Sequence, residues 1–128
     1  MLILGRPPGA EAQTTVTGYA YVAGYNTVAV ISGTQIITTL ATTSSGTAIG
    51  VNPTTGHVYL ADYYNDNVTV LSGTEVVGTL AVGASPISVG VNPISGLIYV
   101  ANHLGQSISI IGDMLPVRVF LPLVLKND

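Results

Sequence analysis

One stretch of the sequence is written twice, forty residues apart. Residues 50–61 read GVNPTTGHVYLA, and residues 90–101 read GVNPISGLIYVA. The likeness continues downstream, where VTVLSGTEVVGTL at 68–80 falls on ISIIGDMLPVRVF at 108–120 with its apolar positions in register. A period of this length is typical of proteins that build one supersecondary unit per repeat. The chain is therefore expected to fold as a row of similar units.

A third copy lies in the N-terminal part of the chain. TVAVISGTQIITTL at 27–40 matches NVTVLSGTEVVGTL at 67–80, including the shared SGT and the final TL. Further upstream, residues 5–24 align with residues 83–102 at an offset of 78, because one loop of the first copy is two residues shorter. The predicted organisation is then as follows: the end of a preceding strand at 1–4, units at 5–42, 43–82 and 83–121, and an apolar tail at 122–128.

Each unit divides into four short apolar runs separated by turn residues, which predicts four antiparallel strands. In the second unit the predicted strands are 47–52, 57–61, 67–71 and 76–81. The last residue of each Asn-Pro turn is a glycine, Gly56 or Gly96, for which we expect a positive φ. In the third unit the fourth strand is expected at 117–121.

The strand composition indicates how the units pack. HVYLA and LIYVA are apolar on both faces, which is typical of a sheet covered on both sides. The first strand of each unit carries small residues, which suit crowded strands near a central axis; they are Ala10, Ala12, Ala48, Gly50, Ser88 and Gly90. The sequence therefore predicts an all-β fold made of β-propeller blades, each with four antiparallel strands.

The repeat resembles the YVTN-type β-propeller repeat, on the strength of GVNPTTGHVYLAD and GVNPISGLIYVAN. The resemblance covers three repeats, from Gly5 to about residue 121, and the first unit departs from it with AQTTVTG. The tail FLPLVLKND resembles the endings of some exported bacterial repeat proteins, so it is either a sorting or anchoring tag or an apolar edge strand interrupted by Pro122. The resemblance of the repeat implies a propeller fold and a relationship to exported and surface-associated bacterial proteins, although propellers also include lyases and lactonases. Since propellers close with about four to eight blades, three blades are expected to be completed by a second copy or by blades outside this chain.

Composition limits the partners. Only 7% of the residues are charged and the net charge is -3, so clustered cations for nucleic acid are lacking. The chain has no cysteine and no apolar run of about 20 residues that could span a bilayer. The N-terminal MLILGRPPGAEAQ does not have the form of a signal peptide. Either the protein is not exported or the start of the gene product lies outside this chain; we expect an extracellular or cell-surface location.

Candidate catalytic groups are sparse, and we predict no catalytic residue, metal or cofactor. His57 aligns with Leu97 and is expected near the surface at a strand entry, whereas His103 lies at the other end of the second strand of its unit. Glu11 is the isolated carboxylate of the inner strands. The oxygen-rich cluster Asp62, Asn65, Asp66 and Asn67 does not have the spacing of a calcium loop, so we interpret it as a turn.

The loops between second and third strands open at one face of a propeller. They contain exposed aromatic and amide residues, which can bind a glycan or a protein; the candidates are Tyr25, Asn26, Tyr63, Tyr64, Asn65, His103 and Gln106. The alternative is that these tyrosines only cover the loop bases.

Two functions remain open at the level of sequence. One is a non-catalytic exported propeller module with a structural or binding role at the bacterial surface. The other is a fragment of a propeller enzyme, of lyase or lactonase type, whose site is completed by further blades. For this chain alone, the exposed blade faces predict self-association, with a six-bladed dimer favoured over higher assembly.

Overall fold

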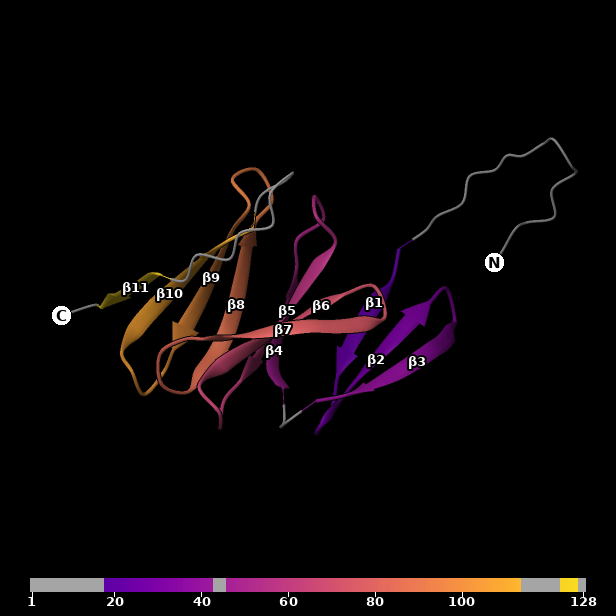
Figure 1. Cartoon of the computed structure of the whole chain (residues 1–128), viewed down its shortest axis with the longest axis horizontal. Helices are drawn as coiled ribbons and strands as arrows, with labels where there is room; N and C mark the ends of the chain where they lie inside the picture. The colour runs from indigo at the N-terminus through magenta and orange to yellow at the C-terminus, as the bar shows by residue number, and fades with distance from the viewer. Residues whose placement is uncertain (1–17, 43–45, 114–122, 127–128) are drawn as a thin grey trace, which may run out of the picture.

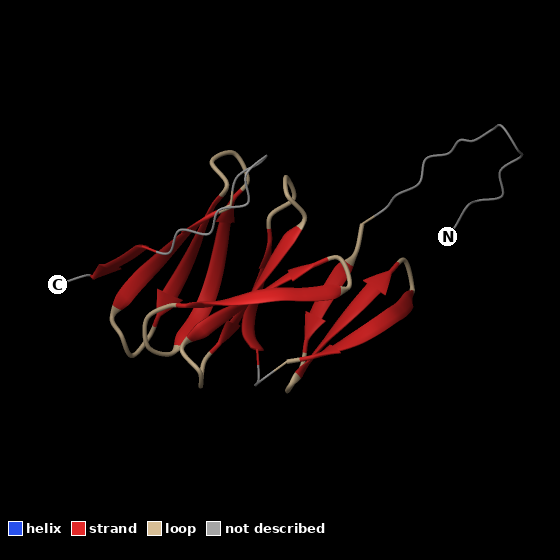
Figure 2. Ribbon diagram, viewed as in Figure 1, coloured by secondary structure: helices blue, strands red, loops and turns tan. Residues whose placement is uncertain are grey.

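The computed structural model describes residues 18–42, 46–113 and 123–126. All regular secondary structure in these residues is β-strand, arranged in three antiparallel sheets (Figures 1 and 2). The predicted all-β class is confirmed. Within the described residues, no helix has the length and apolarity that a membrane crossing would require.

The second sheet shows the repeating unit in full. Its strands are β4 (Gly46–Val51), β5 (His57–Asp62), β6 (Asn67–Ser72) and β7 (Glu75–Ala81), and each pairs with the next in the order of the sequence. These bounds lie within one residue or so of the predicted strands. Alternation of short apolar runs with glycine and Asn-Pro turns was thus sufficient to place all four strands.

The first and third sheets repeat this meander. The first contains β1 (Ala20–Ala23), β2 (Thr27–Ser32) and β3 (Gln35–Ala41) among the described residues. The third contains β8 (Pro86–Asn92), β9 (Leu97–Asn102), β10 (Ser107–Gly112) and β11 (Leu123–Lys126). The inner strand predicted for the first unit, which includes Ala10, Glu11 and Ala12, lies outside the described residues.

The fourth strand predicted for the third unit, at 117–121, lies outside the described residues, and a strand is observed in the tail that follows. Strand β11 pairs with β10 from Ser107 opposite Lys126 to Ile110 opposite Leu123. It falls in the segment 122–128, for which an edge strand was one of the two interpretations left open by the sequence.

The predicted glycine turns are confirmed. Gly56 has φ 80° and Gly96 has φ 75°. In the first of these turns, the Asn52 side-chain oxygen accepts a hydrogen bond from the Thr54 amide at 3.0 Å, and the Gly56 amide donates to the Asn52 carbonyl at 2.8 Å. A glycine supplies the left-handed residue that lets the chain re-enter the sheet.

The sheets pack face to face, and the second sheet is covered on both sides. Strand β4 lies against β8 of the third sheet and against β1 of the first. One apolar cluster joins the first two sheets through Val28, Val58, Leu60 and Leu71. Another joins the second and third sheets through Tyr59, Val68, Val70, Ile98, Val100 and Ile111. The interpretation of HVYLA as a strand buried on both faces is confirmed, since every residue of β5 is buried.

Crowding explains the small residue in the inner strand of the second sheet. A Cβ atom added at Gly50 would lie 2.8 Å from Cγ1 of Val89 on the neighbouring β8. Only a glycine permits this approach of two inner strands. The three described sheets are therefore arranged like successive blades of a propeller.

Candidate functional site

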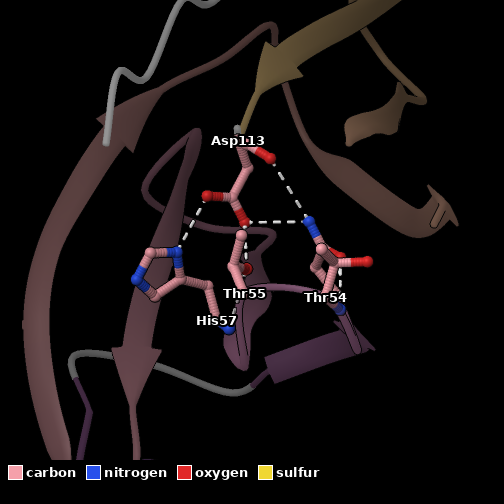
Figure 3. A network of polar contacts seen from close by, with 5 residues as sticks. Thr54, Thr55, His57 and Asp113 are labelled. Carbon is pink, nitrogen blue, oxygen red and sulfur yellow. Dashed lines mark hydrogen bonds and ion pairs between the residues drawn. The ribbon is translucent and has the colours of Figure 1, made fainter. Parts of the chain in front are cut away.

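A buried polar network joins the third sheet to the second (Figure 3). Asp113 directly follows β10, and its amide donates a hydrogen bond to the carbonyl of Gly96 at 2.9 Å. Its side chain is directed away from its own sheet, toward the turn that precedes β5. The aspartate is only 1% exposed, so its carboxylate depends on protein donors in place of water.

The turn before β5 supplies these donors. Oδ2 of Asp113 accepts from the Thr55 hydroxyl at 2.7 Å and from Nδ2 of Asn52 at 3.1 Å. Oδ1 lies 2.8 Å from Nδ1 of His57. The turn holds its own residues in place, because the Thr55 hydroxyl accepts the His57 amide at 3.2 Å. A single short segment thus presents three side chains to one carboxylate.

Tyr59, two residues further along β5, also interacts with Asp113. Burial opposes ionisation of Asp113, but the hydrogen bonds from Tyr59, Thr55 and His57 and the attraction of His57 outweigh it and lower the pKa of the carboxyl. Burial, followed by the hydrogen bond and the charge of Asp113, raises the pKa of Tyr59 far above its ordinary value. The aspartate is therefore ionised at neutral pH and the tyrosine is protonated.

The prediction that His57 lies near the surface is wrong. His57 is 1% exposed, because the third sheet covers the strand entry and provides Asp113 as a partner. The sequence alone does not single out Asp113. A signal does exist in the repeat register: Asp113 stands where the second unit has Gly73, and His57 stands where the third unit has Leu97. Two simultaneous departures from a repeat can mark a contact between units.

A carboxylate, an imidazole and a hydroxyl are the components of a hydrolytic triad, but their order here is different. In a triad the hydroxyl bonds the imidazole, which in turn bonds the carboxylate. Here the Thr55 hydroxyl and the His57 ring both bond the carboxylate directly. Asn52, His57 and Asp113 are each at most 1% exposed. The network is a clamp between sheets.

The predicted binding loops lie together at one end of the sheets. The segments after β1, β5 and β9 run along the lower edge of Figure 1, opposite the Asn-Pro turns. Tyr25 is 75% exposed and Tyr64 is 73% exposed. The Tyr64 ring packs edge-to-face on that of half-buried Tyr63, with centroids 5.2 Å apart. Asn26, Asn65, His103 and Gln106 are also exposed.

The Asp62 cluster forms a turn, in agreement with the interpretation chosen from the sequence. The two oxygens of Asp62 accept from the amide and the side chain of Asn65, at 3.1 and 2.9 Å. Oδ1 of Asp66 accepts from the Ser85 amide at 2.8 Å, which ties this loop to the connection before β8. Among the described residues, no three His, Cys, Asp or Glu side chains are grouped to hold a metal ion.

The two histidines lie at opposite ends of the sheets, as their places in the repeat predict. His57 begins β5, whereas His103 directly follows β9. His103 and Gln106 border an open hollow of about 430 Å³ whose other side includes Ile87, Ala101 and Ile108. This hollow lies where the loop after β9 meets the outward face of the third sheet.

Comparison with known proteins supports the fold. No protein-family model matches the chain, and no curated protein sequence does. Among solved structures, a candidate 6-phosphogluconolactonase from Bacteroides fragilis is similar over 80% of this chain and 33% of its own, with 17% identity and a TM-score of 0.65. The chain thus spans about a third of that protein. At this level of identity the likeness shows the fold: three sheets of a β-propeller type.

A second solved structure, hydrazine synthase from Kuenenia stuttgartiensis, matches less well. It is 23% identical over 52% of this chain and 20% of its own, with a TM-score of 0.49. The chain spans a fifth of that protein.

Proposed function

We propose that this chain is a non-catalytic β-propeller repeat module of the YVTN type that binds a neutral glycan at a bacterial cell surface. The observation that carries the proposal is the one-sided placement of exposed aromatic and amide side chains. They occupy the three equivalent loops after β1, β5 and β9, whereas the opposite end consists of short turns.

The chemistry of these loops suits an uncharged ligand. The exposed rings of Tyr25 and Tyr64 offer flat apolar faces, and the neighbouring amides of Asn26 and Gln106 can donate to and accept from hydroxyl groups. None of the three cationic side chains of the sequence lies in these loops. A sugar presents the complementary combination of apolar ring faces and hydroxyls. A protein partner is the alternative ligand for the same surface.

The burial of the acid–base groups Asp113 and His57 against each other also favours a non-catalytic role. Asp113 and His57 are buried against each other between sheets, where a substrate would have to displace the packing to reach them. The alternative is a fragment of a propeller enzyme of lyase or lactonase type. It has only the fold likeness to the Bacteroides fragilis protein in its favour.

Affinity electrophoresis through gels containing dextran or mannan tests the proposal. The full chain should migrate more slowly in one of these gels, and the variant with both Tyr25→Ala and Tyr64→Ala should lose the retardation. Tyr19→Ala is the matched control, because Tyr19 is exposed at the opposite end of the first sheet. Equal migration of the parent and the double variant in every gel would contradict glycan binding. Turnover of 6-phosphogluconolactone by the full chain would support the enzyme alternative instead.

A further inference from the structure

The third sheet has one face that no described residue covers. Its side chains are Tyr99, Ala101, Ile108 and Ile110, which share a face because Ala101 pairs with Ile108 and Tyr99 with Ile110. Tyr99 is 38% exposed and Ile108 is 43% exposed. Forty residues earlier, the equivalent residues of the second sheet are at most 1% exposed, since the third sheet covers them; they are Tyr59, Ala61, Val68 and Val70.

The first sheet has the complementary face, which likewise no described residue covers. Its side chains are Ala20, Val22, Ala29 and Ile31, again joined by strand pairing. Val22 is 54% exposed, whereas its equivalent Leu60 on the second sheet is 1% exposed against the first sheet. The outer faces of the first and third sheets, as described, are therefore the two halves of an interface that forms twice between the described sheets.

A tyrosine reaches across both internal interfaces to the same position of the next sheet. The Tyr21 hydroxyl donates to the Gly73 carbonyl of the next sheet at 2.9 Å. Tyr59, the equivalent of Tyr21, interacts with Asp113, which stands at the position equivalent to Gly73. The next tyrosine in this series is Tyr99. On the first sheet, the position equivalent to Gly73 is Gly33, with the same turn geometry (φ 63° against 61°).

The inner strands also show that the outer face of the third sheet has room for a further sheet. A Cβ at Gly50 would meet Val89 of the next sheet at 2.8 Å, but a Cβ at the equivalent Gly90 would meet nothing within 4 Å. A glycine is required where another inner strand approaches closely. Gly90 therefore leaves room for another inner strand to approach the face that no described residue covers.

The hollow beside His103 lies at the matching corner of this face. Its residues Ile87 and Gln106 are equivalent to Thr47 and Asp66. At the internal interface, the Thr47 hydroxyl donates to the Pro86 carbonyl at 2.9 Å and Asp66 accepts from the Ser85 amide at 2.8 Å. At the interface between the second and third sheets, the third sheet thus occupies the corner beside Thr47 and Asp66. The equivalent corner of the third sheet, beside Ile87 and Gln106, is the open hollow.

From these equivalences we propose that two copies of this chain pack head to tail, the third sheet of one on the first sheet of the other, with Tyr99 donating to the Gly33 carbonyl across each seam. Both halves of the interface are apolar and carry no charged side chain among the residues named. Two identical seams would close a ring of six blades, within the range of about four to eight in which propellers close. This assembly is independent of the glycan proposal.

Sedimentation velocity on the full chain at micromolar concentration tests the seam. The parent should be a dimer, and Ile108→Lys or Val22→Glu should each raise its dissociation constant by roughly 100-fold or more, because a charge is then buried unpaired in both seams. Tyr99→Phe should raise it on the order of tenfold. Ile94→Lys is the matched control and should remain dimeric, since Ile94 is 96% exposed in a turn away from both faces.

A mixing experiment separates the seam from simple misfolding. An equimolar mixture of Ile108→Lys and Val22→Glu should recover dimers, because one seam then pairs lysine with glutamate and the other is native. Circular dichroism of each variant monitors the fold. A monomeric parent, an open polymer, or a dimer that withstands both charge substitutions would overturn the proposal.

Discussion

The hydroxyl of Tyr21 on one sheet donates a hydrogen bond to the backbone carbonyl of Gly73 on the next, at 2.9 Å. The acceptor lies in the SGT turn between β6 and β7, whose positive φ at Gly73 directs the chain around the turn. The contact joins residues 52 positions apart and ties the outer end of one sheet to its neighbour. It supplements an interface that is otherwise apolar.

Tyr21→Phe should therefore weaken the contact between the first two sheets. The substitution keeps the ring and its packing but leaves the Gly73 carbonyl without this donor, at a cost of about 1 kcal/mol in the free energy of unfolding. Urea unfolding followed by circular dichroism measures the change. Tyr25→Phe is the control, because Tyr25 is 75% exposed; equal midpoints for the two variants would contradict the role of the hydrogen bond.

Asp113 should make stability depend on pH in the acidic range. Its pKa is lower in the folded chain than in the unfolded chain, where it is about 3.9. The ionised carboxylate thus adds stability that is fully present above the unfolded pKa and is lost as the pH falls through the folded pKa. Asp113→Asn should lower the free energy of unfolding by roughly 3 kcal/mol at neutral pH.

The difference between the parent and Asp113→Asn should shrink as the pH is lowered below about 4, because protonation removes the charge that the variant already lacks. Urea midpoints recorded from neutral to acidic pH measure it. Glu75→Gln serves as the control, since Glu75 is exposed. A constant difference between the parent and Asp113→Asn across this range would show that the charge of Asp113 is not what stabilises the clamp.

The Asn-Pro turns give a prediction about backbone conformation. Gly56→Val and Gly96→Val should each lower the free energy of unfolding by about 1 kcal/mol or more, because a β-branched residue is strained at the positive φ of both sites. Gly96→Asn should cost less, since asparagine tolerates the left-handed region. Thermal melts rank the three variants. A Gly96→Asn variant that melts below Gly96→Val would contradict this account.

The repeat predicted the local structure well because each strand and turn depends on nearby residues. Alternating apolar runs and turn glycines placed β4 to β7, and the loops with Tyr25 and Tyr64 were assigned to the correct end. The clamp at Asp113 could not be predicted in this way. Its partners Asn52 and His57 are 61 and 56 residues distant, and burial of His57 depends on how the third sheet covers the second.

The close approach of inner strands leads to a last prediction. Gly50→Ala would place a Cβ 2.8 Å from Cγ1 of Val89 and near the Val91 side chain at 3.2 Å. Valine has little freedom at χ1, so the two sheets would have to separate locally, which should cost about 1–3 kcal/mol. Gly78→Ala on β7 is the control, because a Cβ there would meet nothing within 4 Å. Chemical denaturation of both variants measures the difference. If Gly50→Ala proved as stable as Gly78→Ala, the inner strands would not be packed as closely as described.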